Sequence, residues 1–183
     1  MSRRTKIALI VLLLLLPAAW FGGMAYIRSH VTDLIQHAVD KPLPDFTLVD
    51  RDGKTWSKQD LLGKRAVLHF FRSYCHSCDV EAPAIRALEQ ARPDDTIWLH
   101  VMTDVVLDVD EATTEATIAR KEFTAPILMA DEAFMELFHK ARWSQVTPIT
   151  YVVDKQGMVR FGLRGLQTEQ TISAAVSAVG KGG

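Results

Sequence analysis

The chain has 183 residues, of which 48% are apolar and 23% charged, and its formal net charge is −1. This composition is that of a globular protein with a hydrophobic core, and the length allows one ordinary domain besides an N-terminal segment. The near-neutral charge, without a basic stripe or an arginine-rich run, argues against nucleic acid as a partner.

The N-terminus has the pattern of a membrane-targeting segment. Residues 1–6 are basic, and residues 7–27 carry no charge. As a helix rising about 1.5 Å per residue, this stretch spans ~31 Å, close to the hydrocarbon thickness of a bilayer. We therefore expect a transmembrane anchor at 7–27, with the basic tip in the cytoplasm and the domain beyond the membrane. The alternative is a cleaved signal peptide, with residues 7–16 as its apolar core and Gly23 and Ala25 before the cut.

Residues 28–41 keep the spacing of a helix and are expected to form a stalk, which Pro42 and Pro44 end. The domain should then occupy residues 42–180, with a frayed tail at 181–183.

Strands and helices alternate along this domain. The expected elements are a hairpin at 46–49 and 54–57, a helical turn at 61–64, a strand at 65–71, a helix at 75–91, a strand at 96–102, a helix at 110–121, a strand at 125–129, a helix at 133–141, a hairpin at 149–153 and 159–161, and a last helix carrying Ile172, Ala175, Val176 and Val179. The strand at 65–71 is apolar on both faces, so we expect it to be central and parallel. The order predicts an α/β fold with a mixed sheet flanked by helices.

The two cysteines of the chain, Cys75 and Cys78, lie too close together to staple distant segments, which indicates reactivity. They open a helix that follows a strand, where free backbone N–H groups and the helix macrodipole stabilise a thiolate. We expect Cys75 to be the exposed attacking cysteine, and Cys78, one turn further, to be the buried resolving cysteine of a redox-active disulfide.

The segment Phe70–Pro83 resembles the active-site segment of thioredoxin-like proteins of the AhpC/TSA–redoxin superfamily, and is most similar to the membrane-anchored TlpA/ResA type. The resemblance covers residues 42–180, and its further motifs are Pro44–Leu48, Asp52–Lys54, Leu62–Lys64, Thr147–Asp154 and Gly157. It implies a thioredoxin-like fold with an N-terminal β-hairpin and a protein thiol–disulfide oxidoreductase. It implies no cofactor, because the dithiol itself carries the two electrons.

The resemblance also implies roles at matching positions. Pro148 matches a cis-proline that faces the cysteine pair and, with Thr147, seats an extended substrate segment. Tyr74 replaces the usual tryptophan and keeps an aromatic wall. Glu81 matches an acidic residue near the dithiol, where a carboxylate can shuttle protons or raise a thiol pKa. The alternative for Glu81 is an ordinary solvated helix residue.

Two histidines depart from the family pattern and are expected to tune the cysteines. If protonated, His76 favours the Cys75 thiolate and a more oxidising disulfide, whereas Glu81 acts in the opposite direction. His69 stands where relatives carry Asp or Asn. It is expected either to relay protons near Cys78 or to be a satisfied core histidine. The direction of electron flow therefore stays open.

Three other functions compete with thiol–disulfide exchange. Cys75, His76 and Cys78 are soft ligands that suit copper, with His139 as a fourth candidate, but copper-delivering relatives use a wider cysteine spacing. We therefore expect no metal. A peroxidase needs a Pro and a Thr at set positions before its cysteine, and these are missing. A non-catalytic binding module would not require a dithiol at a helix N-terminus.

The expected protein is an oxidoreductase of the inner membrane with its domain in the periplasm, or a soluble periplasmic protein if the signal is cleaved. Protein thiols and disulfides are the expected substrates, with apocytochrome c during cytochrome c maturation as the leading candidate. A membrane thiol-electron transporter is the expected electron donor. We expect a monomer that binds no nucleic acid.

Overall fold

The computed structural model describes residues 4–5, 13, 15–27, 29, 39–138 and 146–180. Contacts divide the chain into two units, Met1–Gln36 and His37–Gly183. In the first unit, residues 15–27 are helical with exposed side chains. Within the described ranges, no helix combines the length and hydropathy that crossing a membrane requires. The rest of the expected anchor, most of the expected stalk and the expected tail at 181–183 lie outside these ranges.

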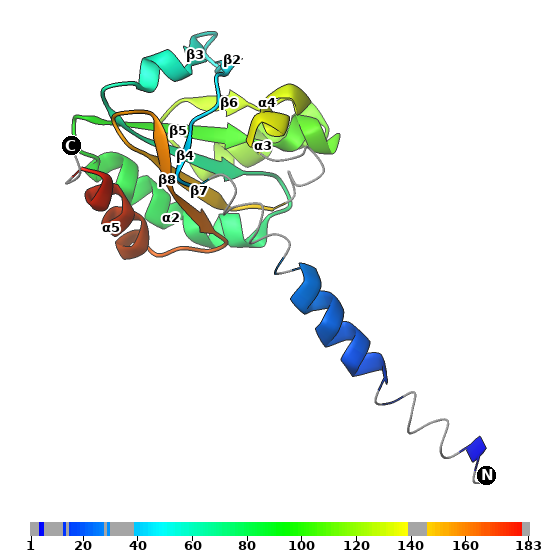
Figure 1. Cartoon of the computed structure of the whole chain (residues 1–183). Coiled ribbons are helices and arrows are strands. Elements are labelled where there is room, and N and C mark those ends of the chain that lie inside the picture. Colours follow the sequence, from blue (N-terminus) through cyan, green and yellow to red (C-terminus); the bar gives the residue numbers. More distant parts are fainter. Residues whose placement is uncertain are drawn as a thin grey trace. The chain divides into compact units, whose positions relative to one another are not determined.

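The second unit is built on a six-stranded mixed sheet with β4 near its centre (Figure 1). In spatial order its strands are β1 (Lys41–Pro42), β8 (Met158–Arg164), β7 (Ile149–Val153), β4 (Arg65–Phe71), β5 (Thr96–Met102) and β6 (Ile127–Met129). β4, β5 and β6 are parallel, whereas β7 is antiparallel to β4, β8 to β7 and β1 to β8. The central position of β4 is as the sequence predicts, but the expected parallel pairing holds only on the side of β5, because β7 on its other side is antiparallel.

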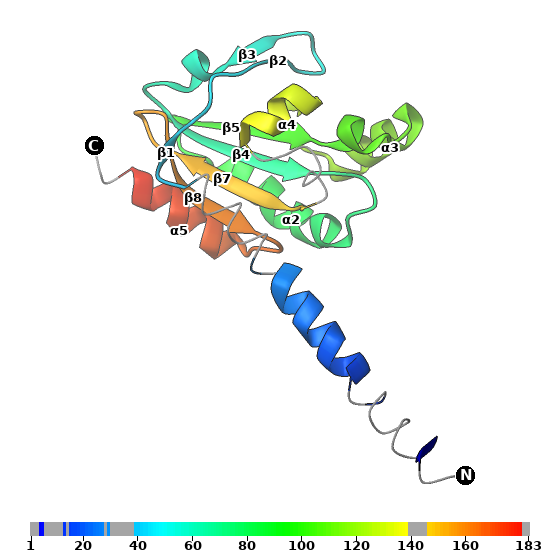
Figure 2. The same cartoon turned by 45° about the vertical axis from the view of Figure 1, so that its right-hand side comes forward.

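Helices cover both faces of the sheet (Figure 2). α2 (His76–Ala91) and α5 (Glu169–Val179) share an apolar cluster with β4, β5 and β7 on one face. On the other face, Phe70 of β4 packs against two phenylalanine rings of α4 (Glu132–Phe138), with ring centroids 5.4 and 6.2 Å away. Side chains alternate along a strand, so His69 and Phe71 point to the opposite face from Phe70, towards α2. The buried site described below lies on the α2 face.

Most predicted elements are confirmed within three residues, and residues 139–141, the predicted end of the helix at 133–141, lie outside the described ranges. The N-terminal hairpin is β2 (Thr47–Val49) with β3 (Thr55–Ser57), and α3 is Glu111–Lys121. β8 is longer than expected, and the 3₁₀ helix η1 (Lys58–Leu61) lies one turn before the expected helical turn. The sequence missed β1, since its proline suggested an interruption, although an edge strand tolerates one. It also missed the short 3₁₀ helix η2 (Asp104–Leu107).

The register of the parallel strands decides which polar side chains meet. His69 of β4 pairs with His100 of β5, and Phe71 pairs with Met102. Paired residues on neighbouring strands project from the same face of the sheet. The two histidines therefore lie side by side under α2, while Phe71 and Met102 lie nearer the end of the strands where α2 begins.

Candidate active site

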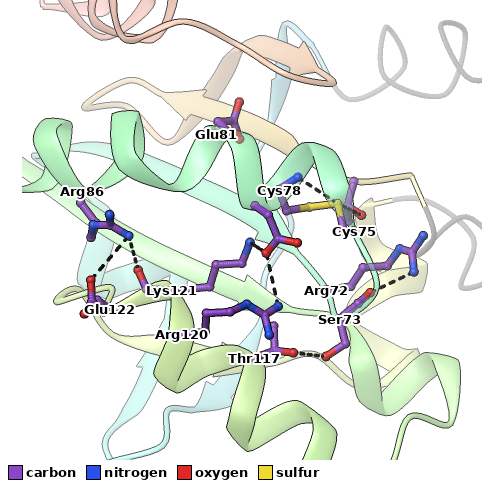
Figure 3. Close-up of polar contacts among 12 residues, drawn as sticks. Arg72, Ser73, Cys75, Cys78, Glu81, Arg86, Thr117, Arg120, Lys121 and Glu122 are labelled. Carbon is purple, nitrogen blue, oxygen red and sulfur yellow. Dashed lines mark hydrogen bonds and ion pairs between the residues drawn. A yellow bond between two sulfur atoms is a disulfide. The ribbon is translucent and has the colours of Figure 1, made fainter.

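A disulfide joins Cys75 and Cys78 at the start of α2, with Cα atoms 5.2 Å apart (Figure 3). Cys75 is the N-cap of α2, and its Sγ accepts a hydrogen bond from the backbone N–H of Cys78 at 3.2 Å. Tyr74, with φ of 54°, turns the chain into the helix. The N-terminus of a helix stabilises negative charge, so this position favours a thiolate on Cys75 once the disulfide opens.

The side chain of Cys75 is 7% exposed and that of Cys78 is 1% exposed. Cys75 is the more exposed of the two, as expected, but it is itself buried in the oxidised protein. Both sulfurs belong to an apolar cluster with Phe71, Met102 and Ile118. The Thr147 hydroxyl also lies 3.5 Å from the Cys75 Sγ. Access to Cys75 is therefore narrow.

The Thr147–Pro148 peptide bond is cis, as the resemblance implies. The Thr147 contact brings this segment against the dithiol from the start of β7. Tyr74 is 74% exposed and His76, the first residue of α2, is also exposed. The structure thus gathers Tyr74, His76 and Thr147 around Cys75.

A buried carboxylate that the sequence did not predict holds the segment before Cys75. Asp104, which is fully buried, accepts hydrogen bonds from the backbone N–H of Ser73 at 2.8 Å and from the Ser73 hydroxyl at 2.5 Å. The Thr114 hydroxyl donates to the same carboxylate at 2.9 Å. Ser73 also contacts Thr117 of α3 at 2.7 Å (Figure 3). The loop that carries Cys75 is therefore tied to η2 and α3.

A second unpredicted group is an ion pair beside the first turn of α2. Lys121, which is 2% exposed, places its Nζ 2.7 Å from Asp79 Oδ1, and Arg120 approaches the same oxygen at 3.3 Å (Figure 3). The hydrogen bond from Lys121 lowers the pKa of Asp79, and burial lowers the pKa of Lys121. The pair ties α3 to the helix that carries the cysteines.

Glu81 and His69 lie in contact beneath α2. Both are at most 1% exposed, and His69 Nε2 is 3.1 Å from Glu81 Oε2. The backbone N–H of Gln167 donates to Glu81 Oε1 at 2.7 Å. The solvated alternative for Glu81 is therefore wrong. Helical spacing turns Glu81 to the same buried side of α2 as Cys78, and this side meets the sheet at His69.

The contact continues through two residues that the sequence did not single out. His69 Nδ1 lies 3.0 Å from His100 Nδ1, and His100 Nε2 lies 2.8 Å from Glu89 Oε1. Glu89 also accepts a hydrogen bond from the backbone N–H of Ala125 at 2.8 Å. We call Glu81, His69, His100 and Glu89 the buried carboxylate–histidine chain. The eight-residue spacing of the two glutamates on α2 was the available signal, because it places both on one face of a helix.

The pKa values of the far pair have opposed causes. Burial, together with the charge of His69, lowers the pKa of His100 to about 4, although Glu89 acts against this. Burial acts to raise the pKa of Glu89, but the hydrogen bonds from His100, Ala125 and Thr124 lower it overall. At neutral pH this pair is a neutral imidazole beside a carboxylate.

We expect His100 to make the fold acid-sensitive. The pKa of His100 is 6.5 in the unfolded chain and about 4 in the folded one. At a pH between these two values, His100 is protonated in the unfolded chain and neutral in the folded chain. The free energy of unfolding should be undiminished above about pH 6.5 and fall towards pH 4, by up to roughly 3 kcal/mol at 1.36 kcal/mol per pKa unit. The lowered pKa of Glu89 also contributes to the free energy of unfolding, but this contribution is lost only when the pH falls below 4.5, the ordinary pKa of a glutamate.

Urea midpoints of the oxidised chain at a series of pH values measure this slope. The His100→Gln variant should have a flatter profile between pH 6.5 and pH 4 than the wild type, because no imidazole titrates at that position. Parallel profiles would contradict the assignment.

Among the residues that the structure describes, no three or more His, Cys, Asp or Glu side chains are grouped to hold a metal ion. His139, the fourth candidate ligand, lies outside them.

The fold and the disulfide at the start of α2 define a thiol–disulfide oxidoreductase of the thioredoxin-like class. A family model described as the AhpC/TSA family matches residues 39–161, and the chain belongs to that family.

The relatives and structures that the chain resembles agree with this class. The thiol-disulfide oxidoreductase ResA of Bacillus thuringiensis subsp. konkukian is 24% identical over 171 residues, covering 93% of this chain and 94% of the relative. A putative thioredoxin from Neisseria meningitidis superposes with a TM-score of 0.64 at 21% identity, covering 78% of this chain and 93% of that one. StoA from Bacillus subtilis gives a TM-score of 0.60 at 21% identity, with coverage of 75% and 97%. At these identities the two structures establish the fold.

Proposed function

We propose that the chain exchanges its Cys75–Cys78 disulfide with the thiols and disulfides of extracytoplasmic proteins, Cys75 attacking and Cys78 resolving. The observation that carries this is the placement of Cys75. Its sulfur caps α2, accepts the Cys78 N–H and lies beside the Thr147 hydroxyl of the cis Thr147–Pro148 segment. In the reducing direction the Cys75 thiolate attacks a substrate disulfide and releases one substrate thiolate. Cys78 then loses its proton, attacks Cys75 and releases the second thiolate.

We further propose that Thr147, Pro148 and the exposed Tyr74 seat an extended substrate segment beside Cys75. The exposed His76 tunes the thiolate, and Glu81 with His69 accepts or supplies the proton of Cys78. Burial supports the assignment of Glu81 and His69, because this carboxylate and imidazole are shielded from water on the same side of α2 as the buried Cys78.

The uncharged segment 7–27 supports a place at the membrane, with the domain of residues 42–180 on its outer side. The TlpA/ResA resemblance favours a reductase that receives electrons from a membrane thiol transporter and acts on apocytochrome c. No organic cofactor takes part in this exchange.

A trapping experiment tests this proposal. In cells, the full-length Cys78→Ala variant should accumulate mixed disulfides through Cys75, because the resolving thiol is gone. The adducts should contain extracytoplasmic proteins and sediment with the membranes. The double variant Cys75→Ala/Cys78→Ala is the control and should trap nothing. Adducts with cytoplasmic proteins, or equal adducts in the control, would contradict the proposal.

A further inference from the structure

Two arginines, Arg72 and Arg164, lie on either side of the Thr147–Pro148 segment. This segment leads into β7, which lies between β4 and β8 in the sheet (Figure 2). On one side, the last residue pair of β4 and β7 joins Phe70 to Ile149, and the same antiparallel register carried two residues further brings Arg72 opposite Thr147. On the other side, Ile149 pairs with Arg164, the last residue of β8.

Local hydrogen bonds fix both arginines beside this segment. Arg72 Nη1 donates to the backbone carbonyl of Ser73 at 3.0 Å, in the loop that carries the attacking cysteine (Figure 3). Next to Arg164, the backbone N–H of Gly165 donates to the carbonyl of Pro148 at 2.8 Å. One arginine is therefore fixed at the end of β4 and the other at the end of β8, with the cis peptide bond between them.

These two arginines differ from most others of the domain in having no carboxylate partner. The arginines that place a nitrogen within 4 Å of a carboxylate oxygen are Arg51, Arg65, Arg86, Arg120 and Arg160. Among the arginines that the structure describes within residues 39–138 and 146–180, the exceptions are Arg72, Arg164 and the exposed Arg92 at the end of α2. Arg72 and Arg164 are half-buried, and a charge partly removed from water is costly unless it is paired. A carboxylate from a bound partner would supply the missing charge.

The carboxylates of the protein that lie around the dithiol already have donors of their own. Asp79 is bound by Lys121, and Asp104 accepts from the backbone and hydroxyl of Ser73. Glu81 is buried against the sheet. The positive charge on the two sides of the Thr147–Pro148 segment is therefore left for a ligand of negative charge.

We propose that Arg72 and Arg164 select protein substrates in which acidic residues flank the reactive cysteine, each arginine binding one carboxylate. This rests on the proposed function and names its substrate class. The planar guanidinium group has donors that match the two oxygens of a carboxylate. In an extended segment, the residues two positions before and after the cysteine project from the same side as the cysteine, roughly 7 Å from it. These are the two positions at which we expect Asp or Glu.

A single reaction of the reduced full chain with peptide disulfides tests the proposal. Three peptides share one sequence around a central cysteine and carry Asp, Asn or Lys at the two flanking positions. Each rate is divided by the rate of the same peptide with dithiothreitol, which corrects for the intrinsic reactivity of each disulfide. The wild type should prefer the Asp peptide over the Lys peptide by roughly tenfold, since an exposed arginine–carboxylate pair contributes about threefold. The Asn peptide should lie between them.

Arg72→Gln and Arg164→Gln should each reduce this preference about threefold, and the double variant should bring it close to one. Arg92→Gln is the matched control. It also removes an arginine charge that has no carboxylate partner, but about 25 Å along the helix axis from Cys75, so it should keep the wild-type preference. A lost charge near Cys75 changes its thiolate equally for all three peptides, so the ratio of rates reports substrate selection.

A wild-type preference close to one, or an unchanged preference in the double variant, would overturn the proposal. Raising the ionic strength from about 0.05 M to about 0.5 M provides a measurement that does not depend on the folding of the variants. Because salt screens exposed charges, most of the wild-type preference should disappear, and a preference that survives would also overturn the proposal.

A peptide with serine in place of cysteine separates this proposal from the exchange reaction itself. Its Asp form should shift the nitrogen-15 Nε–H signals of Arg72 and Arg164 in the wild type and leave the signal of Arg92 in place. Unmoved signals at Arg72 and Arg164 would overturn the proposal. Shifted signals without reaction of any peptide disulfide would support the binding of acidic segments and contradict only the proposed exchange.

Discussion

Replacing Cys75 with serine is expected to abolish catalytic reduction of a disulfide-bonded peptide, because a serine hydroxyl stays protonated and does not attack a disulfide. In the structure Cys75 carries the sulfur that caps α2 and meets Thr147, so the loss should come from chemistry, with the fold retained. The measurement is turnover with dithiothreitol as electron donor, beside the circular dichroism spectrum of each protein.

Cys78→Ser is the matched control. It should also stop turnover, yet keep one stoichiometric attack, seen as an adduct between the protein and the peptide. An adduct that forms through Cys78 in Cys75→Ser, and not through Cys75 in Cys78→Ser, would reverse the two roles. The 1% exposure of Cys78 is the physical reason to expect the stated order.

Asp104→Ala is expected to lower the free energy of unfolding by about 3–4 kcal/mol, because it leaves three buried donors without their charged acceptor. Those donors are the backbone N–H and hydroxyl of Ser73 and the hydroxyl of Thr114. Ser73 lies two residues before Cys75, so the variant should also expose the dithiol to a bulky alkylating reagent after reduction.

Urea unfolding of the oxidised chain measures the stability loss. Asp94→Ala is the matched control, since it removes an exposed carboxylate and should change the stability by no more than about 0.5 kcal/mol. If both variants unfold at the same urea concentration, Asp104 does not anchor the loop.

The regular elements were predictable because their causes are local. The apolar run at 65–71 predicts a buried strand, and the helical spacing after Cys75 predicts a helix with one buried side. Both elements are confirmed. The hairpin strands β7 and β8 flank a turn whose Gly157 has a φ of 76°, a conformation that glycine adopts readily. β1 was missed because two residues on a sheet edge have no pattern of their own; they are ordered by pairing with β8.

The site was predictable only in part, because some of its contacts join residues that are far apart in the sequence. Cys75, Cys78 and Glu81 belong to one segment, so their spacing and the family resemblance located them together. Asp104 resembled any polar residue after a strand, and nothing local joins it to Ser73, which is thirty-one residues away. His69 had two open interpretations, and its contacts with Glu81 and His100 fit both a satisfied core residue and a proton-carrying one.

The sequence by itself determined the reactive pair, its place at a strand–helix junction, and the order of strands and helices around it. These depend on neighbours within a few residues, where spacing dictates geometry. Only the tertiary structure decided what lies beneath the pair. Strand register placed His69 beside His100, and the packing of α2 on the sheet brought a glutamate to each ring. Buried hydrogen bonds join groups that are distant in sequence, so these contacts exist only once the helix has packed on the sheet.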